Sequence, residues 1–503
     1  PQQQPQQQQQ PLQQQQQPIQ QQQLVQQQPQ SQPNVTQMRV LAPLPPQVLV
    51  QTPQVIRPPP PPQAPAPGAG AILGLTDLQS QYVGPIGVGT TLLPGGCTPS
   101  ADDASLLAQN GNLATFWAGL AQVDDVARAT ICQRREEATL WTVFDTGSTN
   151  IWIASDLCTQ GPCMLAGRGR YNHLNSVTYK PPALSSQVFV QFGTGSLSGP
   201  QAVDDFNIGP FKAKGQTFAM MQTQSGMVFD EIPFEGIVGL AFPAMAASNA
   251  TPFFDNLIQQ KALPHNEFAF YFGSGDVNTN AVLWGGVDPA FYEGNIEFFP
   301  VHDPYYWSTE LVKFEIGDQC YLGFEQGCLV IPPGHMNIDG RQHRPLCAIV
   351  DTGTTFITAE EYLFSDIMER LSEVRCAEMT DQSHPDIKFT LRTGDGQLRK
   401  FVLSRHEYMA VSESSLCQPS VMKINIPKKH GPAMVLGEVF LKNYFAVFDR
   451  DGDVNAPGIA RIGLAKSRHD EGAVKRLKVL TSSQQSFKDS RPEPWQQLVT
   501  RSL

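Results

Sequence analysis

Two copies of one short motif constrain this chain more than any other feature. Residues 143–149 read Val-Phe-Asp-Thr-Gly-Ser-Thr, and residues 349–355 read Ile-Val-Asp-Thr-Gly-Thr-Thr. At average residue usage, one such motif arises by chance in a chain of this length with odds on the order of 10⁻³, and two are far rarer. We therefore predict that Asp145 and Asp351 are the two halves of one active site. The alternative, two ordinary Asp turns at strand ends, does not explain the duplication.

Two carboxylates held close together can activate water without a metal or a covalent nucleophile. Like charges at short range cannot both ionise easily, so the pair shares a proton and its two apparent pKa values separate. One carboxylate then takes a proton from water while the other protonates the carbonyl oxygen of the substrate. Because this behaviour belongs to the pair, no fixed acid and base roles are assigned to Asp145 and Asp351. Neither a metal nor a cofactor is expected.

The neighbouring residue types suit this chemistry. We predict six of them to support catalysis: Thr146, Gly147, Ser148, Thr352, Gly353 and Thr354. The glycines allow a sharp turn and a close approach to the carboxylates. The first hydroxyl of each motif can bond across to the other loop, and the second can bond the outer carboxylate oxygen and tune its basicity.

The rest of the chain is dominated by short strand patterns in two halves, with a few helices. Residues 188–203 predict a β-hairpin with a glycine-rich tip, and residues 237–243 predict a buried strand. A helix is expected to begin at Thr251, with Thr251 as its N-cap and Pro252 as its first residue. A second helix is expected after the second motif, with a capping box formed by Thr358 and Glu361. The fold class predicted is mainly β.

From about Tyr82 to Ser467 the chain resembles the pepsin family of bilobal aspartic proteases. The landmarks occur in family order and are residues 144–152 (Phe-Asp-Thr-Gly-Ser-Thr-Asn-Ile-Trp), 192–196, 235–241, 283–286, 348–354 and 436–440. The resemblance implies a pepsin-like acid-protease fold of two β-lobes, with a flap hairpin that closes over an extended peptide or protein substrate in a cleft. It also implies disulfides Cys158–Cys163, which span a turn-rich loop, and Cys376–Cys417.

The flap departs from the usual pepsin pattern. Its tip corresponds to Phe192, Gly193 and Thr194, and Trp152 corresponds to the tryptophan of the substrate cleft that normally hydrogen-bonds a flap tyrosine. Phe192 stands at the tyrosine position, keeps the aromatic packing and lacks the hydroxyl. A phenylalanine at this flap position makes the chain similar to one group of proteases from apicomplexan parasites, plasmepsins IX and X and Toxoplasma aspartyl protease 3. The proteases of this group are maturases of secretory-organelle proteins. We favour the interpretation that the missing hydroxyl alters the mobility and specificity of the flap. The alternative is that the change from tyrosine to phenylalanine is neutral.

Composition divides the chain into segments. Residues 1–69 are rich in Gln and Pro, bury too little apolar surface to order, and are predicted to be disordered. The N-terminal protease lobe is expected over residues 70–268, and the C-terminal lobe over residues 269–466. Residues 92–139 separate a predicted strand from the first aspartate loop. We interpret this segment as a surface insertion, with wrongly retained coding sequence as the alternative. Residues 467–503 are expected to form a polar, solvated tail.

The remaining cysteines leave their pairing open. Cys97 and Cys132 lie in the insertion and form a candidate pair, and Cys320, Cys328 and Cys347 precede the second motif. With His343 nearby, a metal site is one interpretation of the second group. A disulfide plus a free thiol is the interpretation we favour.

Charge and hydropathy restrict the partners and the compartment. The formal net charge of −11 argues against a nucleic-acid partner. No run reaches the ~18 apolar residues that a membrane span needs, and no signal peptide is visible, although the chain begins with Pro and not with Met. The cysteines favour an oxidising compartment, so the protein is expected in the secretory pathway, a secretory organelle, an acidic vacuole or the extracellular space. It is expected to be a monomer. The functional hypotheses are a maturase-like endopeptidase, a digestive vacuolar protease, and a non-catalytic binding protein on a protease fold.

Overall fold

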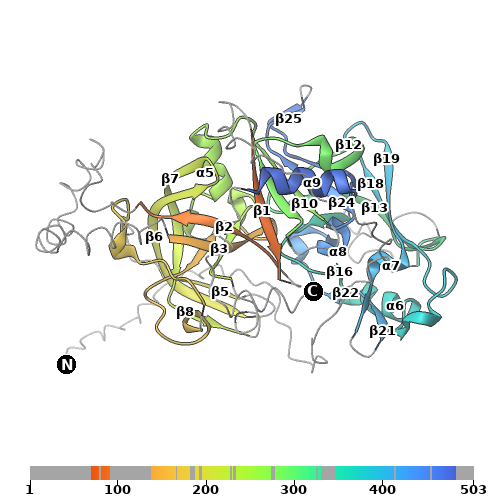
Figure 1. Cartoon of the computed structure of the whole chain (residues 1–503). Coiled ribbons are helices and arrows are strands. Elements are labelled where there is room, and N and C mark those ends of the chain that lie inside the picture. Colours follow the sequence, from red (N-terminus) through yellow and green to blue (C-terminus); the bar gives the residue numbers. More distant parts are fainter. Residues whose placement is uncertain are drawn as a thin grey trace, which may run out of the picture.

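The computed structural model describes residues 70–78, 81–90, 138–165, 167–181, 187–191, 195–226, 229, 234–273, 278–323, 327–329, 346–412, 415–453 and 456–482. The predictions for residues 1–69, for residues 92–137 of the insertion with Cys97 and Cys132, and for the flap tip Phe192–Thr194 lie outside the described residues. The predicted mainly-β fold is confirmed, and Figure 1 shows its two lobes side by side. The exact lobe boundaries stay a prediction.

Short strands make up most of both halves. The first half contains β1 (Ala71–Asp77), β2 (Tyr82–Val88), β3 (Ala138–Asp145), β4 (Ile151–Ala154), β5 (Gln187–Gln191), β6 (Ser196–Ile208), β7 (Phe211–Met221), β8 (Thr223–Ser225), β9 (Gly236–Gly239) and helix α5 (Phe253–Gln259).

The second half begins with β10 (Glu267–Phe272), β11 (Asn280–Trp284), β12 (Tyr292–Pro300), β13 (Ser308–Ile316), β14 (Gln319–Gly323), β15 (Cys347–Val350) and β16 (Ile357–Ala359). It continues with β17 (Val374–Arg375), β18 (Ile387–Arg392), β19 (Leu398–Leu403), β20 (Met409–Val411), β21 (Leu416–Pro419), β22 (Val421–Lys423), β23 (Ala433–Leu436), β24 (Tyr444–Asp449), β25 (Gly452–Asp453), β26 (Ala456–Pro457) and β27 (Arg461–Ser467). Its helices are α6 (Glu361–Arg370), α7 (Arg405–Tyr408), α8 (Glu438–Leu441) and α9 (Glu471–Leu480).

One sheet joins the two halves. Its strand order is β12-β27-β24-β10-β11-β1-β2-β3-β9-β4-β7-β6-β5, with β8 paired to β6. A second sheet, β19-β18-β13-β15-β23-β16-β22 with β14 on β13, lies entirely in the second half. Hydrogen bonding is therefore continuous from the C-terminal strands, through β10 and β1, to the strand that carries Asp145.

Each aspartate loop lies in the same arrangement of strands. In the first half, β9 lies between β3 and β4, parallel to β3 and antiparallel to β4, and pairs Gly239 with Asp145. In the second half, β23 lies between β15 and β16 in the same senses and pairs Leu436 with Val350. The duplicated motif is thus part of a duplicated substructure.

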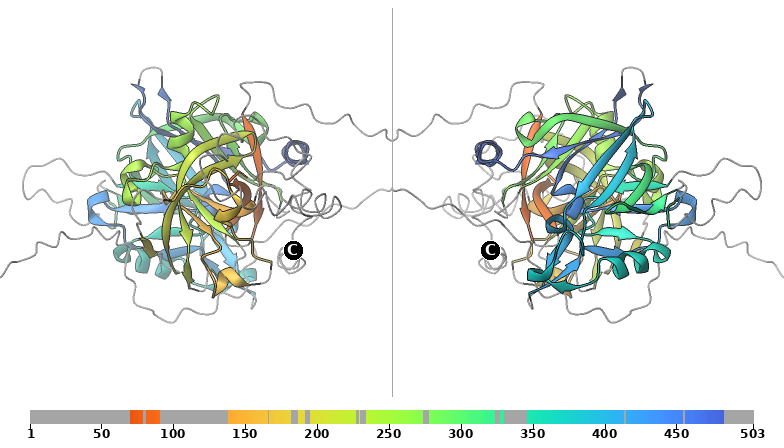
Figure 2. Two further views of the ribbon diagram at one scale, coloured as in Figure 1. Left: turned by 90° about the vertical axis from the view of Figure 1, so that its left-hand side faces the viewer. Right: turned by 90° about the vertical axis from the view of Figure 1, so that its right-hand side faces the viewer.

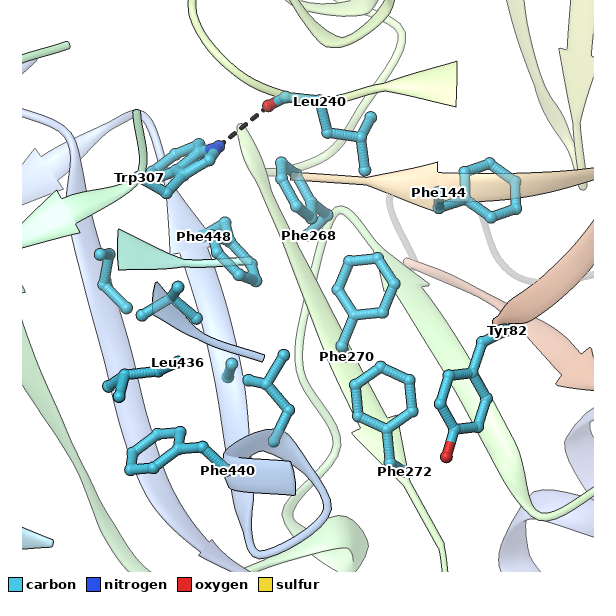
Figure 3. Packing of buried hydrophobic residues seen from close by; sticks show 14 of the residues in the cluster. Tyr82, Phe144, Leu240, Phe268, Phe270, Phe272, Trp307, Leu436, Phe440 and Phe448 are labelled. Atoms are coloured by element: carbon cyan, nitrogen blue, oxygen red, sulfur yellow. Dashed lines mark hydrogen bonds between the residues drawn. The ribbon is translucent and has the colours of Figure 1, made fainter. Parts of the chain in front are cut away.

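The alternation of residues along β10 explains how the joining sheet is buried on both faces. Its phenylalanines, Phe268, Phe270 and Phe272, enter the main core (Figure 3), while the residues between them point to the other face because side chains alternate along a strand. Ala473 and Leu477 of α9 cover that other face. Helix α9, dark blue in Figure 2, lies at the outer edge of the molecule. Residues 471–480 of the segment expected as a polar tail form this helix, and residues 483–503 of that segment lie outside the described residues.

The described cysteines form three disulfides. Cys158–Cys163 and Cys376–Cys417 are the pairs that the resemblance implies, and Cys320–Cys328 is the third. Cys347 is a buried thiol outside these bridges. The interpretation of one disulfide and one thiol in this region is confirmed.

The two predicted N-caps are wrong by one and by two residues. Helix α5 begins at Phe253 with Pro252 as its N-cap, so Thr251 lies outside it. Helix α6 begins at Glu361 with Glu360 as its N-cap. Thr358 belongs to β16 instead, where its hydroxyl accepts the backbone N–H of Val435 at 3.1 Å. Among the described residues, no helix is long and apolar enough to cross a membrane.

Candidate active site

Apolar strands fix the positions of both aspartates. Asp145 ends β3, whose Leu140, Trp141 and Phe144 are buried, and Asp351 directly follows β15, which is buried throughout. Because β3 and β15 pack on both faces, the loops that follow them have little freedom to move.

The two loops face each other across their glycines. A methyl group built on Gly147 would lie 2.3 Å from Oδ2 of Asp351, and one built on Gly353 would lie 2.3 Å from Oδ1 of Asp145. Such contacts are far inside van der Waals distance, so only glycine lets each carboxyl group sit against the opposite loop. The structure therefore brings Asp145 and Asp351 together, as the duplicated motif predicts.

Donors from its own loop fix the carboxyl group of Asp145. The backbone N–H of Gly147 donates to Oδ1 at 2.8 Å, and the hydroxyl of Ser148 donates to Oδ2. The predicted bond from Ser148 to the outer oxygen is confirmed.

Asp351 is held in the same way and has a perturbed pKa. The backbone N–H of Gly353 donates to Oδ1 at 2.8 Å, and the hydroxyl of Thr354 donates to Oδ2 at 2.7 Å. Burial and the neighbouring Asp145 carboxyl raise the pKa of Asp351 to about 7, against the lowering effect of these two donors. The pair therefore keeps one proton in an acidic medium, where two separate aspartates would both be ionised.

A reciprocal pair of threonine bonds joins the loops. The N–H of Thr146 donates to Oγ1 of Thr352 at 3.0 Å, and the N–H of Thr352 donates to Oγ1 of Thr146 at 3.0 Å. Each hydroxyl in turn donates to a carbonyl of the opposite half: Thr146 to Val350 at 2.9 Å and Thr352 to Phe144 at 2.7 Å. The predicted bonding across the loops is confirmed.

The structure describes the two strands of the flap hairpin, and the tip at residues 192–194 lies outside the described residues. β5 pairs with β6 in antiparallel register, with Gln191 opposite Ser196. Trp152 lies in β4 and is 2 % exposed, in a cluster with Val188 and Leu197 of the hairpin. The tryptophan is thus packed beneath the hairpin, and the roles of Phe192 and its two neighbours stay predictions.

Sequence reasoning missed one acidic residue behind Asp351. Glu438 opens α8, and its backbone N–H donates to the carbonyl of Thr354 at 2.8 Å. Its side chain is fully buried, and neither carboxyl oxygen has a hydrogen-bond partner among the described residues. Burial raises the pKa of Glu438 well above its usual value, with Lys442 acting in the opposite direction. Residues 436–440 were recognisable as a landmark, but burial of the glutamate left no signal in the sequence.

Comparisons with known proteins agree with this geometry. The family model "Eukaryotic aspartyl protease" matches residues 134–465. Aspartic protease 3 of Toxoplasma gondii is 34% identical over 339 residues, which cover 65% of this chain and 48% of the relative. Plasmepsin IX of Plasmodium falciparum (isolate NF54) is 28% identical over 399 residues, covering 68% and 61% of the two chains. Pepsin A of Callithrix jacchus is 30% identical over 329 residues, covering 64% and 76%. The matches thus cover about half to three fifths of the two parasite relatives.

Proposed function

Because the chain belongs to the eukaryotic aspartyl protease family, we propose that it is an aspartic endopeptidase whose catalytic residues are Asp145 and Asp351. The observation that carries this proposal is the mutual approach of the two loops, in which each glycine lies against the carboxyl group of the opposite aspartate.

The proposed reaction uses one shared proton and one water molecule. The ionised carboxyl group takes a proton from water while the water oxygen attacks the peptide carbonyl carbon, and the protonated carboxyl group gives its proton to the carbonyl oxygen. The tetrahedral intermediate then collapses: the carboxyl group that took the proton from water gives it to the leaving nitrogen, the C–N bond breaks, and a hydroxyl of the intermediate returns its proton to the other carboxylate. The raised pKa of Asp351 supports this chemistry, because the pair retains one proton up to about pH 7.

The pH dependence of activity follows from the same pair. The competent state carries one proton on the two carboxyl groups, so activity is lost when the last proton leaves. We expect the alkaline limb of the kcat/KM profile, which reports the free enzyme, to fall near pH 7, where the pair loses its shared proton.

For the biological role, we propose limited processing of secretory-organelle proteins in an apicomplexan parasite. The similarity to Aspartic protease 3 of Toxoplasma gondii and to plasmepsin IX supports this assignment. The three disulfides support an oxidising secretory compartment. A monomer that takes extended peptides beneath the flap, with Phe192, Gly193 and Thr194 against the substrate and Trp152 behind them, completes the proposal.

A peptide-library assay with the full chain at acidic pH tests the activity. Asp145→Asn and Asp351→Asn should each abolish cleavage while retaining the fold by circular dichroism. Asp318→Asn is the matched control, because Asp318 is fully exposed and, among the described residues, pairs with Lys388 at 3.2 Å. Undiminished cleavage by either active-site variant would refute the assignment.

The breadth of cleavage separates the maturase role from digestion in a vacuole. A maturase cuts a native secretory protein at a few sites with a shared sequence, whereas a digestive enzyme cuts a denatured protein at many sites. The third hypothesis, a binding protein, predicts that no peptide is turned over and that statine inhibitors give no thermal shift.

A further inference from the structure

Trp307 is a fully buried residue that lies immediately before β13 in the second half of the chain. Its indole packs against Phe242 of the first half, with ring centroids 4.6 Å apart, and against Phe448 at 5.1 Å and Phe268 at 5.8 Å. Figure 3 shows Trp307 beside Phe448 and Phe268, with the hydrogen bond of its indole drawn as a dashed line.

That hydrogen bond connects Trp307 to the first aspartate loop. The indole N–H donates to the carbonyl of Leu240 at 2.9 Å (Figure 3), and the backbone N–H of Leu240 donates to the carbonyl of Asp145 at 2.8 Å. Leu240, whose N–H holds the backbone of Asp145, is therefore itself held through its carbonyl by the side chain of Trp307.

The backbone of Trp307 connects to the second aspartate loop. The N–H of Val350 donates to the carbonyl of Trp307 at 2.9 Å, and the carbonyl of Val350 accepts the hydroxyl of Thr146 at 2.9 Å. Val350 directly precedes Asp351 in the chain. Trp307 is therefore connected to each aspartate loop through hydrogen bonds of a single intermediate residue, Leu240 for the first loop and Val350 for the second.

We propose that Trp307 is a positioning residue that fixes the spacing of the Asp145 and Asp351 carboxyl groups. This role deepens the proposed protease activity and rests on it. The threonine bonds join the loops at their centres, whereas Trp307 joins the backbones behind them. Of its two connections, only the indole N–H crosses between the halves and can be removed by substitution, because the other uses its main-chain carbonyl.

The chain supplies a matched control for removal of the indole. Trp284 is also buried among aromatic rings, with Phe268 at 5.6 Å and Phe144 at 5.8 Å. Its indole nitrogen has no hydrogen-bond partner among the described residues. Trp307→Phe and Trp284→Phe therefore remove the same atoms from similar surroundings, but only Trp307→Phe removes a hydrogen bond to an aspartate loop.

We expect Trp307→Phe to lower kcat about tenfold or more relative to Trp284→Phe, with little change in KM, because small misplacements of reacting groups are costly. The alkaline limb of the kcat/KM profile should also move to lower pH by about half a unit or more. The sign follows because the Asp145 charge raises the pKa of Asp351, and greater separation weakens that effect. The other titratable groups near Asp351, Tyr306 and Glu438, are the same in both variants.

Equal kcat values and equal alkaline limbs in the two variants would overturn the proposal. If Trp307→Phe does not fold, 3-benzothienylalanine at position 307 tests the same bond, because sulfur replaces the N–H in a ring of nearly the same shape. That protein should show the same loss of kcat and the same shift, and wild-type behaviour would overturn the proposal. A folded but inactive wild-type chain would instead refute the proposed function, so the two failures are distinguishable.

Discussion

Thr352→Val is the sharpest test of how the two aspartate loops are held together. Valine has nearly the shape of threonine, so the substitution removes the hydroxyl without opening a cavity. In the wild-type chain this hydroxyl accepts the N–H of Thr146 at 3.0 Å and donates to the carbonyl of Phe144 at 2.7 Å. Thr352 is 2 % exposed, so water does not replace either partner.

The cost follows from the two groups that lose their partners. Each buried polar group left unsatisfied costs about 1–3 kcal/mol, so Thr352→Val should lower the free energy of unfolding by about 2–6 kcal/mol. That is a large share of the total of roughly 5–15 kcal/mol typical of folded proteins. The activity of the folded fraction should fall as well, because the loops carry the carboxyl groups.

Urea unfolding followed by tryptophan fluorescence measures the first effect, and kcat per active site measures the second. Thr142→Val is the matched control. Thr142 is also fully buried, but its hydroxyl has no hydrogen-bond partner among the described residues, so its removal should be neutral or stabilising. If the two valine variants unfold at the same urea concentration, the reasoning about the threonine bonds is wrong.

Three further substitutions have directions that the structure fixes. Thr354→Val removes a donor that lowers the pKa of Asp351, so that pKa should rise above about 7 and the alkaline limb of the kcat/KM profile should move to higher pH; a shift to lower pH would contradict this. Gly147→Ala places a methyl 2.3 Å from Oδ2 of Asp351 and should lower kcat by about 100-fold or more, whereas Gly394→Ala, with open space around it, should not. Glu438→Gln should raise stability at pH 7.5 more than at pH 4.5 in urea titrations. An acid whose pKa is raised in the folded state contributes less to stability as the pH rises above its pKa in the unfolded chain, whereas Gln does not titrate. An equal effect of the substitution at both pH values would therefore contradict the raised pKa of Glu438 as the cause.

The local chemistry of the site could be predicted from the sequence because each motif is short and complete. The Asp, Thr and Gly residues, and the hydroxyl that follows them, define the loop, its turn and its donors without reference to the rest of the chain. Pairing of the loops followed from duplication alone. The cross-loop bonds of Thr146 and Thr352 and the donors Ser148 and Thr354 were expected for this reason, and the structure contains them.

Features that depend on tertiary context could not be predicted in this way. Thr358 and Glu361 have the spacing of a capping box, yet β16 extends to Ala359 and the threonine hydroxyl serves the sheet by accepting the N–H of Val435. The local pattern indicated a helix cap, and pairing of β16 with β23 determined the actual use of that hydroxyl. The same holds for Trp307, because the sequence does not show which carbonyl a buried indole faces.

The continuous sheet gives the active site a stringent dependence on the whole fold. β3, which ends at Asp145, is bonded through β2, β1 and β11 to β10, and β10 is bonded to β24 of the second half. Each half completes its own aspartate loop, but neither half contains both of the motif aspartates that share the proton. The raised pKa of Asp351 depends on burial and on a charge from the other half, so it is a property of the assembled lobes and not of the motif. Separation of the lobes would therefore lower that pKa and remove the shared proton even if both Asp-Thr-Gly loops kept their own hydrogen bonds.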